Sequence, residues 1–347
     1  MNRRARFATA AGIVVLLLAG VFAYRHWHSS GFSGTRDEIL SLMPNDPTSV
    51  VFLDLVQFRS SNFLPQLLSW APGFPAEEDY VKFVQATGFN YERDLDRVAL
   101  AFTRQGNSST VFAVADGRFD RKKIEAYAAQ SGERINNQNA KNNHIVFALN
   151  LKNSTHKSFF TFLRDDRIAW TDDPAYAALF QQAYSFVGKK DWKEHFARLG
   201  GTAVFAVIRQ DEATTEMLAQ QAPGGFRSPQ LASLVSQLQW ITIGGKPEGE
   251  DLRVVMEGQS ATESTIHQLK DFLGGILLLA QVGLNGPKNR KEMDPQLREA
   301  YLNLLKTAEV ENVDRGTEKS VRVILQITPS FLEAVKKASM TGAANGH

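Results

Sequence analysis

The pattern of apolar and polar positions beyond residue 40 alternates between strand signals and helix signals. Residues 50–55 read Val-Val-Phe-Leu-Asp-Leu, a β-rich run bounded by prolines. Helical spacing follows at residues 63–70 and 79–87. Residues 98–103 and 110–115 form two apolar runs joined by Gln-Gly-Asn-Ser-Ser, which predicts a hairpin.

A helix and a strand complete this first set. Asp120 is placed to cap a helix that runs through Gln130 with Ile124 and Ala128 on its inner face. Apolar residues then alternate as one face of a strand, namely Ile145, Phe147, Leu149 and Leu151. The predicted order of elements is therefore β-α-β-β-α-β.

The second half of the chain repeats this order. It contains a strand, a helical stretch with a Pro-Gly-Gly break, two paired strands, a helix and a last strand, at 203–208, 217–239, 240–244, 252–257, 261–282 and 321–327. Ser260 and Glu263 predict a capping box for the helix. Val98 and Val111 superpose on Gln239 and Leu252 at an offset of about 141 residues, which indicates an internal duplication.

The second copy also contains an inserted helix near 295–308, with Asp294 as its cap and Pro295 in its first turn. We therefore predict an α+β fold in which two β-α-β-β-α-β (ferredoxin-like) units, with mainly antiparallel sheets, follow an N-terminal transmembrane helix. The predicted divisions are an anchor, a flexible tether, a first unit, a second unit and a disordered tail, at 1–28, 29–40, 41–188, 189–338 and 339–347.

The N-terminal segment has the composition of a membrane anchor. Its apolar run from Phe7 to Tyr24 covers roughly 27 Å as a helix, enough to cross a hydrocarbon core. The residues expected to lie in the membrane are Phe7, Ile13, Val14, Val15, Leu16, Leu17, Leu18, Val21, Phe22 and Tyr24. A cleaved signal peptide ending at Ala23 is the alternative interpretation.

The charges around the run predict its orientation. Arg3, Arg4 and Arg6 precede it and outweigh Arg25 after it, so the N-terminus should stay in the cytoplasm. We expect a single-pass protein of the bacterial inner membrane with the bulk of the chain outside the cytoplasm. The lack of cysteine agrees with a bacterial envelope protein, because exported eukaryotic regions of this size commonly carry disulfides.

Overall charge bears on the partners. A formal net charge of +2 without a concentrated basic stripe argues against a nucleic-acid partner. The expected partners are the membrane, through the N-terminal helix, and an envelope protein or a lipid.

Two further stretches carry a family resemblance. Leu42-Met43-Pro44-Asn45-Asp46 precedes the strand that begins at Val50, and Phe162 to Asp173 precedes a helix. Together with the anchor, these features resemble uncharacterised bacterial membrane-anchored proteins with duplicated sheet-and-helix units. The resemblance implies the fold and the location, and no activity.

Clustered carboxylates are the most site-like polar feature. Asp165-Asp166 and Asp172-Asp173 could bind a divalent cation, but the first pair reads as a hairpin turn. The second pair ends at Pro174, which indicates a helix cap.

Histidines and glycines give no ligand set. The spacing of the histidines predicts no metal site, and we interpret them as surface or packed residues: His26, His28, His144, His156, His195 and His267. Gly244-Gly245-Lys246 lacks the earlier glycine of a phosphate loop and is expected in a hairpin loop. The apolar stretch from Phe272 to Leu284 is too short to span a membrane, so we expect a buried helix with a close Gly-Gly contact, or a groove facing lipid or a partner.

These observations leave two functional hypotheses. The favoured one is a non-enzymatic binding or scaffolding module of the cell envelope, with no catalytic, cofactor-binding or metal residue assigned. The alternative is an envelope hydrolase or metal-dependent enzyme that brings Asp54, Asp116, Asp165 and Asp172 together by folding.

Overall fold

The computed structural model describes residues 36–61, 63, 78–105, 108–135, 145–150, 157–179, 190–211, 229–316 and 318–344. These form two compact units: an N-terminal unit that comprises the described residues up to Arg198 except Ser61 and Phe63, and a C-terminal unit that comprises those two residues and the described residues from Leu199 onward. Both combine helices with antiparallel strand pairs, which confirms the α+β class. None of the helices in the described ranges is long and apolar enough to span a membrane.

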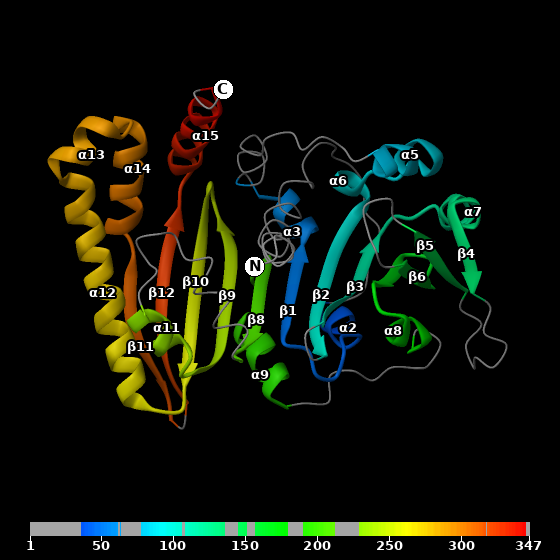
Figure 1. The fold of residues 1–347 in the computed structure, drawn as a ribbon, viewed down its shortest axis with the longest axis horizontal. Helices are drawn as coiled ribbons and strands as arrows, with labels where there is room; N and C mark the ends of the chain where they lie inside the picture. Colours follow the sequence, from blue (N-terminus) through cyan, green and yellow to red (C-terminus); the bar gives the residue numbers. More distant parts are fainter. Residues whose placement is uncertain are drawn as a thin grey trace. The chain divides into compact units, whose positions relative to one another are not determined.

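Seven strands form the sheet of the N-terminal unit (Figure 1). Their order is β1 (Ser49–Asp54), β2 (Leu95–Gln105), β3 (Ser108–Gly117), β7 (Arg167–Thr171), β6 (Lys157–Arg164), β5 (Val146–Asn150) and β4 (Gly132–Ile135). The predicted hairpins β2–β3 and β6–β7 are both present. Every neighbouring pair in this series is antiparallel.

The helices of this unit are short. They are α2 (Arg36–Leu40), α3 (Leu55–Arg59), α5 (Glu78–Thr87), α6 (Tyr91–Asp94), α7 (Arg121–Ser131), α8 (Pro174–Leu179) and α9 (Lys190–Arg198). The predicted caps hold, since the Asp120 carboxylate accepts a hydrogen bond from the Lys123 amide and the Asp173 carboxylate accepts one from the Ala175 amide.

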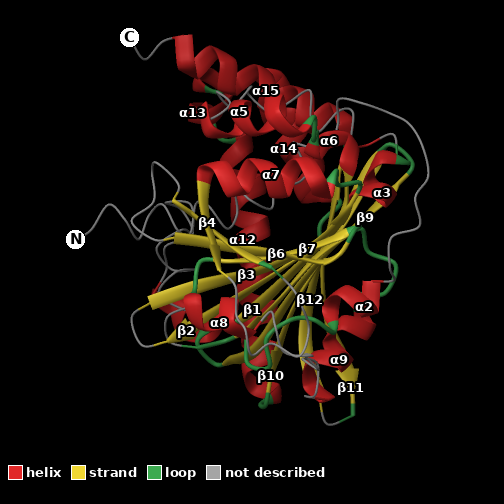
Figure 2. Ribbon diagram, turned by 90° about the vertical axis from the view of Figure 1, so that its right-hand side faces the viewer, coloured by secondary structure: helices red, strands yellow, loops and turns green. Residues whose placement is uncertain are grey.

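The two faces of this sheet carry separate cores. On one face, α7 buries Ile124 and Ala128 against Phe147, Phe160 and Phe162. The opposite face carries α2 and α8, and its small residues Ala99, Ala101 and Ala169 are fully buried. Figure 2 shows α7 and α2 on opposite sides of these strands.

The ferredoxin-like arrangement predicted for each unit is wrong in its strand neighbours. In a split β-α-β arrangement, another strand separates the two strands that a helix joins. Here β1 pairs directly with β2, and the β6–β7 hairpin occupies the place beside β3. Local patterns predict the elements, but long-range pairing decides which strands are neighbours, and the β6–β7 hairpin was not counted in the predicted unit.

Five strands form the sheet of the C-terminal unit. Their order is β11 (Glu309–Arg315), β12 (Glu318–Ile327), β10 (Asp251–Ser260), β9 (Leu238–Glu248) and β8 (Val204–Arg209). β8 and β9 are again direct antiparallel neighbours. Within the described part of this unit, β11 pairs with β12 alone.

The β9–β10 hairpin is tighter than its sequence indicates. Gly244, Gly245 and Lys246, expected in a loop, lie inside β9, and the turn is Gly249-Glu250 with φ +65° at Gly249. Glycine adopts this left-handed conformation without steric cost. Pro247 is tolerated because the described pairing of β8 with β9 extends only to Gly245.

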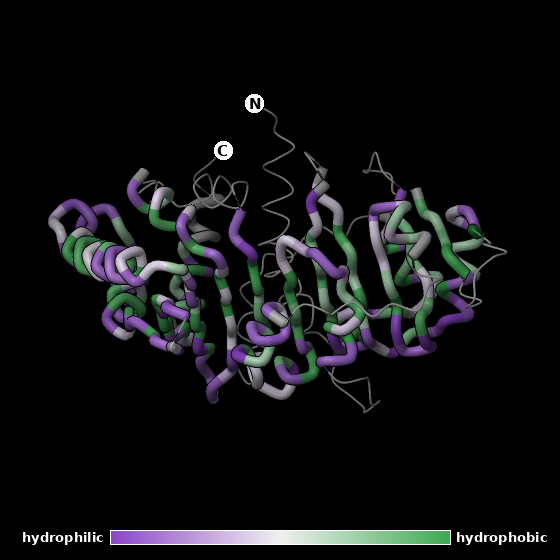
Figure 3. The backbone as a smooth tube through the Cα atoms, turned by 90° about the horizontal axis from the view of Figure 1, so that it is seen from below, coloured by the Kyte–Doolittle hydropathy of each residue, from purple (hydrophilic) through white to green (hydrophobic). Residues whose placement is uncertain are grey.

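The helices of this unit are α11 (Pro229–Val235), α12 (Glu263–Asn285), α13 (Pro287–Glu292), α14 (Pro295–Lys306) and α15 (Pro329–Ala344). The core lies where α11 and α12 meet the sheet, and it comprises Leu234, Leu238, Ile266, Leu269 and Val321. In Figure 3, hydrophobic positions run along the strands and polar positions gather at several strand ends.

Two boundary predictions and one predicted helix cap need correction. The predicted flexible tether at 29–40 overlaps α2. This part of the chain is held in place because Ile39 and Leu40 are buried. The predicted tail at 339–347 overlaps α15, which continues to Ala344. The capping box is absent: Thr262 precedes α12 without a side-chain cap, and Ser260 belongs to β10.

Several predictions fall outside the described residues. These are most of the predicted helix at 63–70, the first part of that at 217–239, the strand residue Leu151, and residues 1–35 with the whole anchor.

Candidate functional site

The C-terminal half of α12 exposes an apolar face. Ile266 and Leu269 near its start are buried, whereas Leu278, Leu279 and Val282 are 65%, 73% and 68% exposed. Val282 follows Leu278 by four residues and Leu279 by three, so it neighbours both on the helix surface. The other exposed large hydrophobic residues in the described part of the chain, Val56, Val81 and Ile135, reach at most 42%. We call Leu278, Leu279 and Val282 the apolar stripe.

Glycines flank the apolar stripe without close neighbours. A Cβ atom added at Gly274, Gly275 or Gly283 would meet no atom within 4 Å outside the local helix backbone. The expected close Gly-Gly contact of a buried helix is therefore wrong. Beside the apolar stripe α12 packs against α14, where the Gln281 side chain donates to the Leu305 carbonyl oxygen at 3.0 Å.

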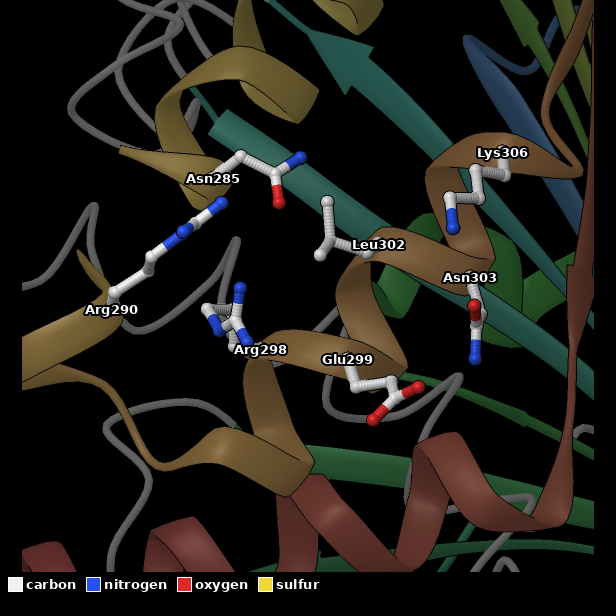
Figure 4. Close-up of a pocket in the computed structure, with 7 residues that line it drawn as sticks. All are labelled: Asn285, Arg290, Arg298, Glu299, Leu302, Asn303 and Lys306. Carbon is white, nitrogen blue, oxygen red and sulfur yellow. The ribbon is translucent and has the colours of Figure 1, made fainter. Parts of the chain in front are cut away.

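A hollow of about 420 Å³ lies between the end of α12, α13 and α14 (Figure 4). Its lining is mostly polar and consists of Asn285, Arg290, Arg298, Glu299, Leu302, Asn303 and Lys306. We call these residues the basic hollow. In Figure 4, the Arg290 and Arg298 side chains extend into the same space from α13 and α14. Leu302, which is 8% exposed, is its buried apolar member.

Local structure holds the two arginines in place. The Asp294 carboxylate accepts hydrogen bonds from the Gln296 and Leu297 amides, which fixes the first turn of α14 just before Arg298. The Asn289 side chain donates to the Gly283 carbonyl oxygen at 2.8 Å, which ties α13, and thus Arg290, to the end of α12.

The charges of the basic hollow are unbalanced. Arg290, Arg298 and Lys306 are cationic, and Glu299 is the single carboxylate in the lining. Within the described ranges, none of the three cations forms a side-chain ion pair. Guanidinium and ammonium groups without a carboxylate partner favour an anion.

The four aspartates of the enzyme hypothesis lie elsewhere, in the N-terminal unit. Asp54 and Asp116 belong to a charged row that crosses β1, β2, β3 and β7 in register: Asp54, Arg97, Asp116 and Arg167. Arg97 thus stands between the two carboxylates. Its Nε donates to Asp54 at 3.0 Å, and Arg167 donates to Asp116 at 2.5 and 2.9 Å.

The remaining two aspartates have structural contacts. Asp165 lies in the β6–β7 turn and accepts from Arg121 at 3.0 Å, and Asp172 accepts from the Val111 amide at 2.8 Å. Glu38 of α2 joins the charged row by accepting from Arg167 at 2.9 Å. Burial would raise the pKa of Glu38, but hydrogen bonds and charges from Arg167 and Arg164 outweigh it and lower that pKa.

A second carboxylate cluster lies on the C-terminal sheet. Glu257 accepts from Arg315, from Ser320 at 2.8 Å and from Arg322 at 3.1 Å. Burial alone would raise its pKa, but the hydrogen bonds and charges of these partners lower it to about 2. These neighbours thus keep Glu257 ionised, and its carboxylate oxygens already accept their hydrogen bonds.

Histidine and carboxylate positions form no metal centre in the residues that the structure describes. His195 is buried on α9, and His267 contacts Glu263 and Asn312 on the surface. His26, His28, His144 and His156 lie outside the described residues, as do the anchor positions and Arg3, Arg4 and Arg6.

Sequence reasoning identified the apolar stretch of α12 but missed the basic hollow. Arg290, Arg298 and Lys306 are spread over two helices with acidic residues between them, so they form no single charge run. The predicted cap at Asp294 could have located two of these cations. It fixes where α14 begins, and so places Arg298 near the start of that helix and Lys306 in its last turn.

Comparison with known proteins gives no family. No family model and no curated protein matches the chain. Among solved structures, crystal form IV of TP0453 is similar with a TM-score of 0.45 at 10% identity, covering 84% of this chain and 93% of that chain. Crystal form III of TP0453 gives a TM-score of 0.43 at 9% identity, covering 86% and 97%. Similarity at this level supports no argument about function.

Proposed function

We propose that this protein is a non-enzymatic binding module of the bacterial cell envelope, anchored in the inner membrane by its N-terminal helix. The apolar run from Phe7 to Tyr24 supports the anchor, and Arg3, Arg4 and Arg6 support a cytoplasmic N-terminus. Both units then lie outside the cytoplasm. The internal duplication inferred from the sequence fits the strand hairpin followed by a helix that each unit contains, β2–β3–α7 and β9–β10–α12.

The observation that carries the binding role is the exposed apolar stripe of α12. Soluble surfaces scatter single apolar residues, whereas three neighbouring side chains on one helix face, each more than 60% exposed, are typical of a contact surface. We therefore assign binding to the α12 end of the C-terminal unit.

The enzyme hypothesis gains no support from the carboxylates on which it rested. Asp54 and Asp116 are separated by Arg97 and held by arginines, Asp165 lies in a turn, and Asp172 accepts from a backbone amide. Carboxylates engaged in this way stabilise the sheet, and they offer no free pair for acid–base chemistry.

Two measurements on the intact chain test the anchor and its direction. A phosphatase that folds only outside the cytoplasm, fused after the last residue, should be active in cells, and the fusion should stay in membranes after an alkaline wash. The Leu17→Arg variant should lose both properties because a charge at the centre of the span disfavours insertion. An inactive fusion of the unaltered chain, or its recovery in the soluble cytosol, would contradict the proposal.

A third measurement tests the binding surface. A photoreactive residue at Leu279 should form adducts in living cells that the same residue at Asp165, an exposed turn position in the other unit, does not form. Equal labelling at both positions would remove α12 from the proposal while leaving the anchor intact.

A further inference from the structure

We infer that the apolar stripe and the basic hollow together bind the membrane surface, with the phosphate of an anionic glycerophospholipid in the hollow. This inference rests on the proposed function, because the anchor would hold the C-terminal unit at a bilayer. It adds the chemistry of the ligand and the residues that recognise it.

The stripe and the hollow are continuous along one helix. Asn285, part of the hollow, follows Val282 by three residues and lies on the same side of α12. Apolar groups that enter the acyl region at Leu278 and Leu279 would thus place the hollow at the depth of the headgroups. A helix with one exposed apolar side and cations beside it has the pattern of interfacial binding.

The donors of the hollow suit a phosphodiester. Arg290 and Arg298 present planar guanidinium groups that match phosphate oxygens, and Lys306 adds a third positive charge. The side-chain amides of Asn285 and Asn303 also line the hollow, and Asn285 keeps one N–H beyond the one that it donates to the Gln281 carbonyl oxygen. A hollow of about 420 Å³ has room for a headgroup rather than for a single ion.

The single carboxylate restricts the choice of headgroup. Glu299 lies on the same lining as Arg298 and can only accept hydrogen bonds when ionised. A headgroup with hydroxyl donors beyond its phosphate, such as glycerol, satisfies both charges. Three cations against one carboxylate leave the hollow positive, which favours an anionic over a zwitterionic lipid.

The charges of the hollow favour a lipid surface over a protein as the occupant. Other cations of the described C-terminal unit have a carboxylate partner, as Lys288 has in Glu292 and Arg322 has in Glu311. Arg290, Arg298 and Lys306 line the hollow at the end of α12 without such a partner in the described ranges. Apolar insertion beside unpaired cations is the complement of an anionic bilayer, whose headgroups are negative above an apolar interior.

The absence of cysteine permits a direct test. A Leu279→Cys variant of the full chain carries one thiol, which can be labelled with a fluorophore sensitive to polarity. The labelled protein is reconstituted into vesicles of phosphatidylcholine alone or of phosphatidylcholine with phosphatidylglycerol. We expect a blue shift and stronger emission with phosphatidylglycerol, quenching by lipids that carry a quencher in the acyl chain, and a smaller response at high salt.

Matched variants locate the headgroup site. Arg290→Gln with Arg298→Gln in the labelled chain should abolish the difference between the two lipid mixtures. Lys288→Gln with Lys291→Gln removes the same formal charge from α13 outside the hollow and should retain the difference. A label at Asp165→Cys should not respond.

The outcomes separate the inference from the proposed function. Protein that fails to remain in vesicles would contradict the anchor. Anchored protein whose label at position 279 reports water in both mixtures would overturn the lipid inference alone. A response to soluble glycerol phosphate without any response to vesicles would also overturn it, as would a response that follows protein concentration and not lipid, which would indicate contact between copies.

Discussion

Arg167 donates two hydrogen bonds to Asp116, at 2.5 and 2.9 Å, and both side chains are almost fully shielded from solvent. The pair joins β3 to β7 at their registered positions. Burial would lower the pKa of Arg167, but Asp116 and Glu38 outweigh it and raise that pKa, so the guanidinium stays charged.

Breaking this pair should be costly. Asp116→Asn leaves a buried guanidinium with a weaker partner, and we expect it to lower the free energy of unfolding by about 3–5 kcal/mol. The matched control is Asp165→Asn, which removes an exposed partner of Arg121 and should cost less than about 1 kcal/mol. Denaturant unfolding of the purified chain measures both free energies, and equal losses would contradict the buried role of Asp116.

Glu257 should make stability depend on pH in the acid range. Its pKa is about 2 in the folded protein and 4.5 in the absence of partners, so the folded state favours the carboxylate. Its contribution is complete above the unfolded pKa and is lost as the pH falls from about 4.5 toward about 2.

The Glu257→Gln variant isolates this contribution. It should lose up to about 3 kcal/mol relative to the unaltered chain at pH 7, and the difference should shrink as the pH is lowered through that window. Glu311→Gln, which removes a more exposed partner of Arg322, should cost less than about 1 kcal/mol. A difference between Glu257→Gln and the unaltered chain that does not change with pH would oppose this account.

Two glycines of the C-terminal unit should respond in opposite directions to alanine. A Cβ at Gly258 would lie 2.9 Å from a methyl carbon of Leu238, so Gly258→Ala should destabilise by about 1–3 kcal/mol through overpacking. A Cβ at Gly275 has open space within α12, so Gly275→Ala should stabilise by about 0.5–1 kcal/mol. Thermal unfolding of the two variants gives the signs, and a loss at Gly275 would indicate a contact absent from the isolated chain.

Two leucines on one helix should behave differently when truncated. Leu269→Ala removes a side chain from the core and should cost about 2–5 kcal/mol. Leu279→Ala removes an exposed side chain and should change the free energy of unfolding by less than about 0.5 kcal/mol. Comparable losses in denaturant unfolding would mean that Leu279 is covered in solution.

Local signals predicted much of the fold. The carboxylates of Asp120, Asp173 and Asp294 begin helices where the sequence places them, since a cap needs only the next few residues. Strand neighbours were not predictable in this way. The row from Asp54 to Arg167 joins residues more than a hundred positions apart, and nothing local to either residue specifies the partner.

The candidate site likewise has one feature that is visible locally in the sequence and one that depends on long-range packing. An apolar run at Phe272 to Leu284 is visible in the sequence, but its exposure depends on how far α14 and the sheet extend along α12. Periodicity reports that a helix has an apolar side and does not report whether another element covers it. The cations of the basic hollow meet only when α13 and α14 fold back on the end of α12.

The position of β11 at the edge of the C-terminal sheet bears on aggregation between copies of the protein. Within the described ranges no strand pairs with the outer side of β11, and an unpaired edge of this kind is where further strands can add. Glu309, Glu311 and Asp314 place charged side chains along this edge, where Glu311 pairs with Arg322 and Asp314 pairs with Lys319. Charged side chains along an edge strand disfavour the addition of another strand, so copies of this protein that approach edge to edge should pair poorly.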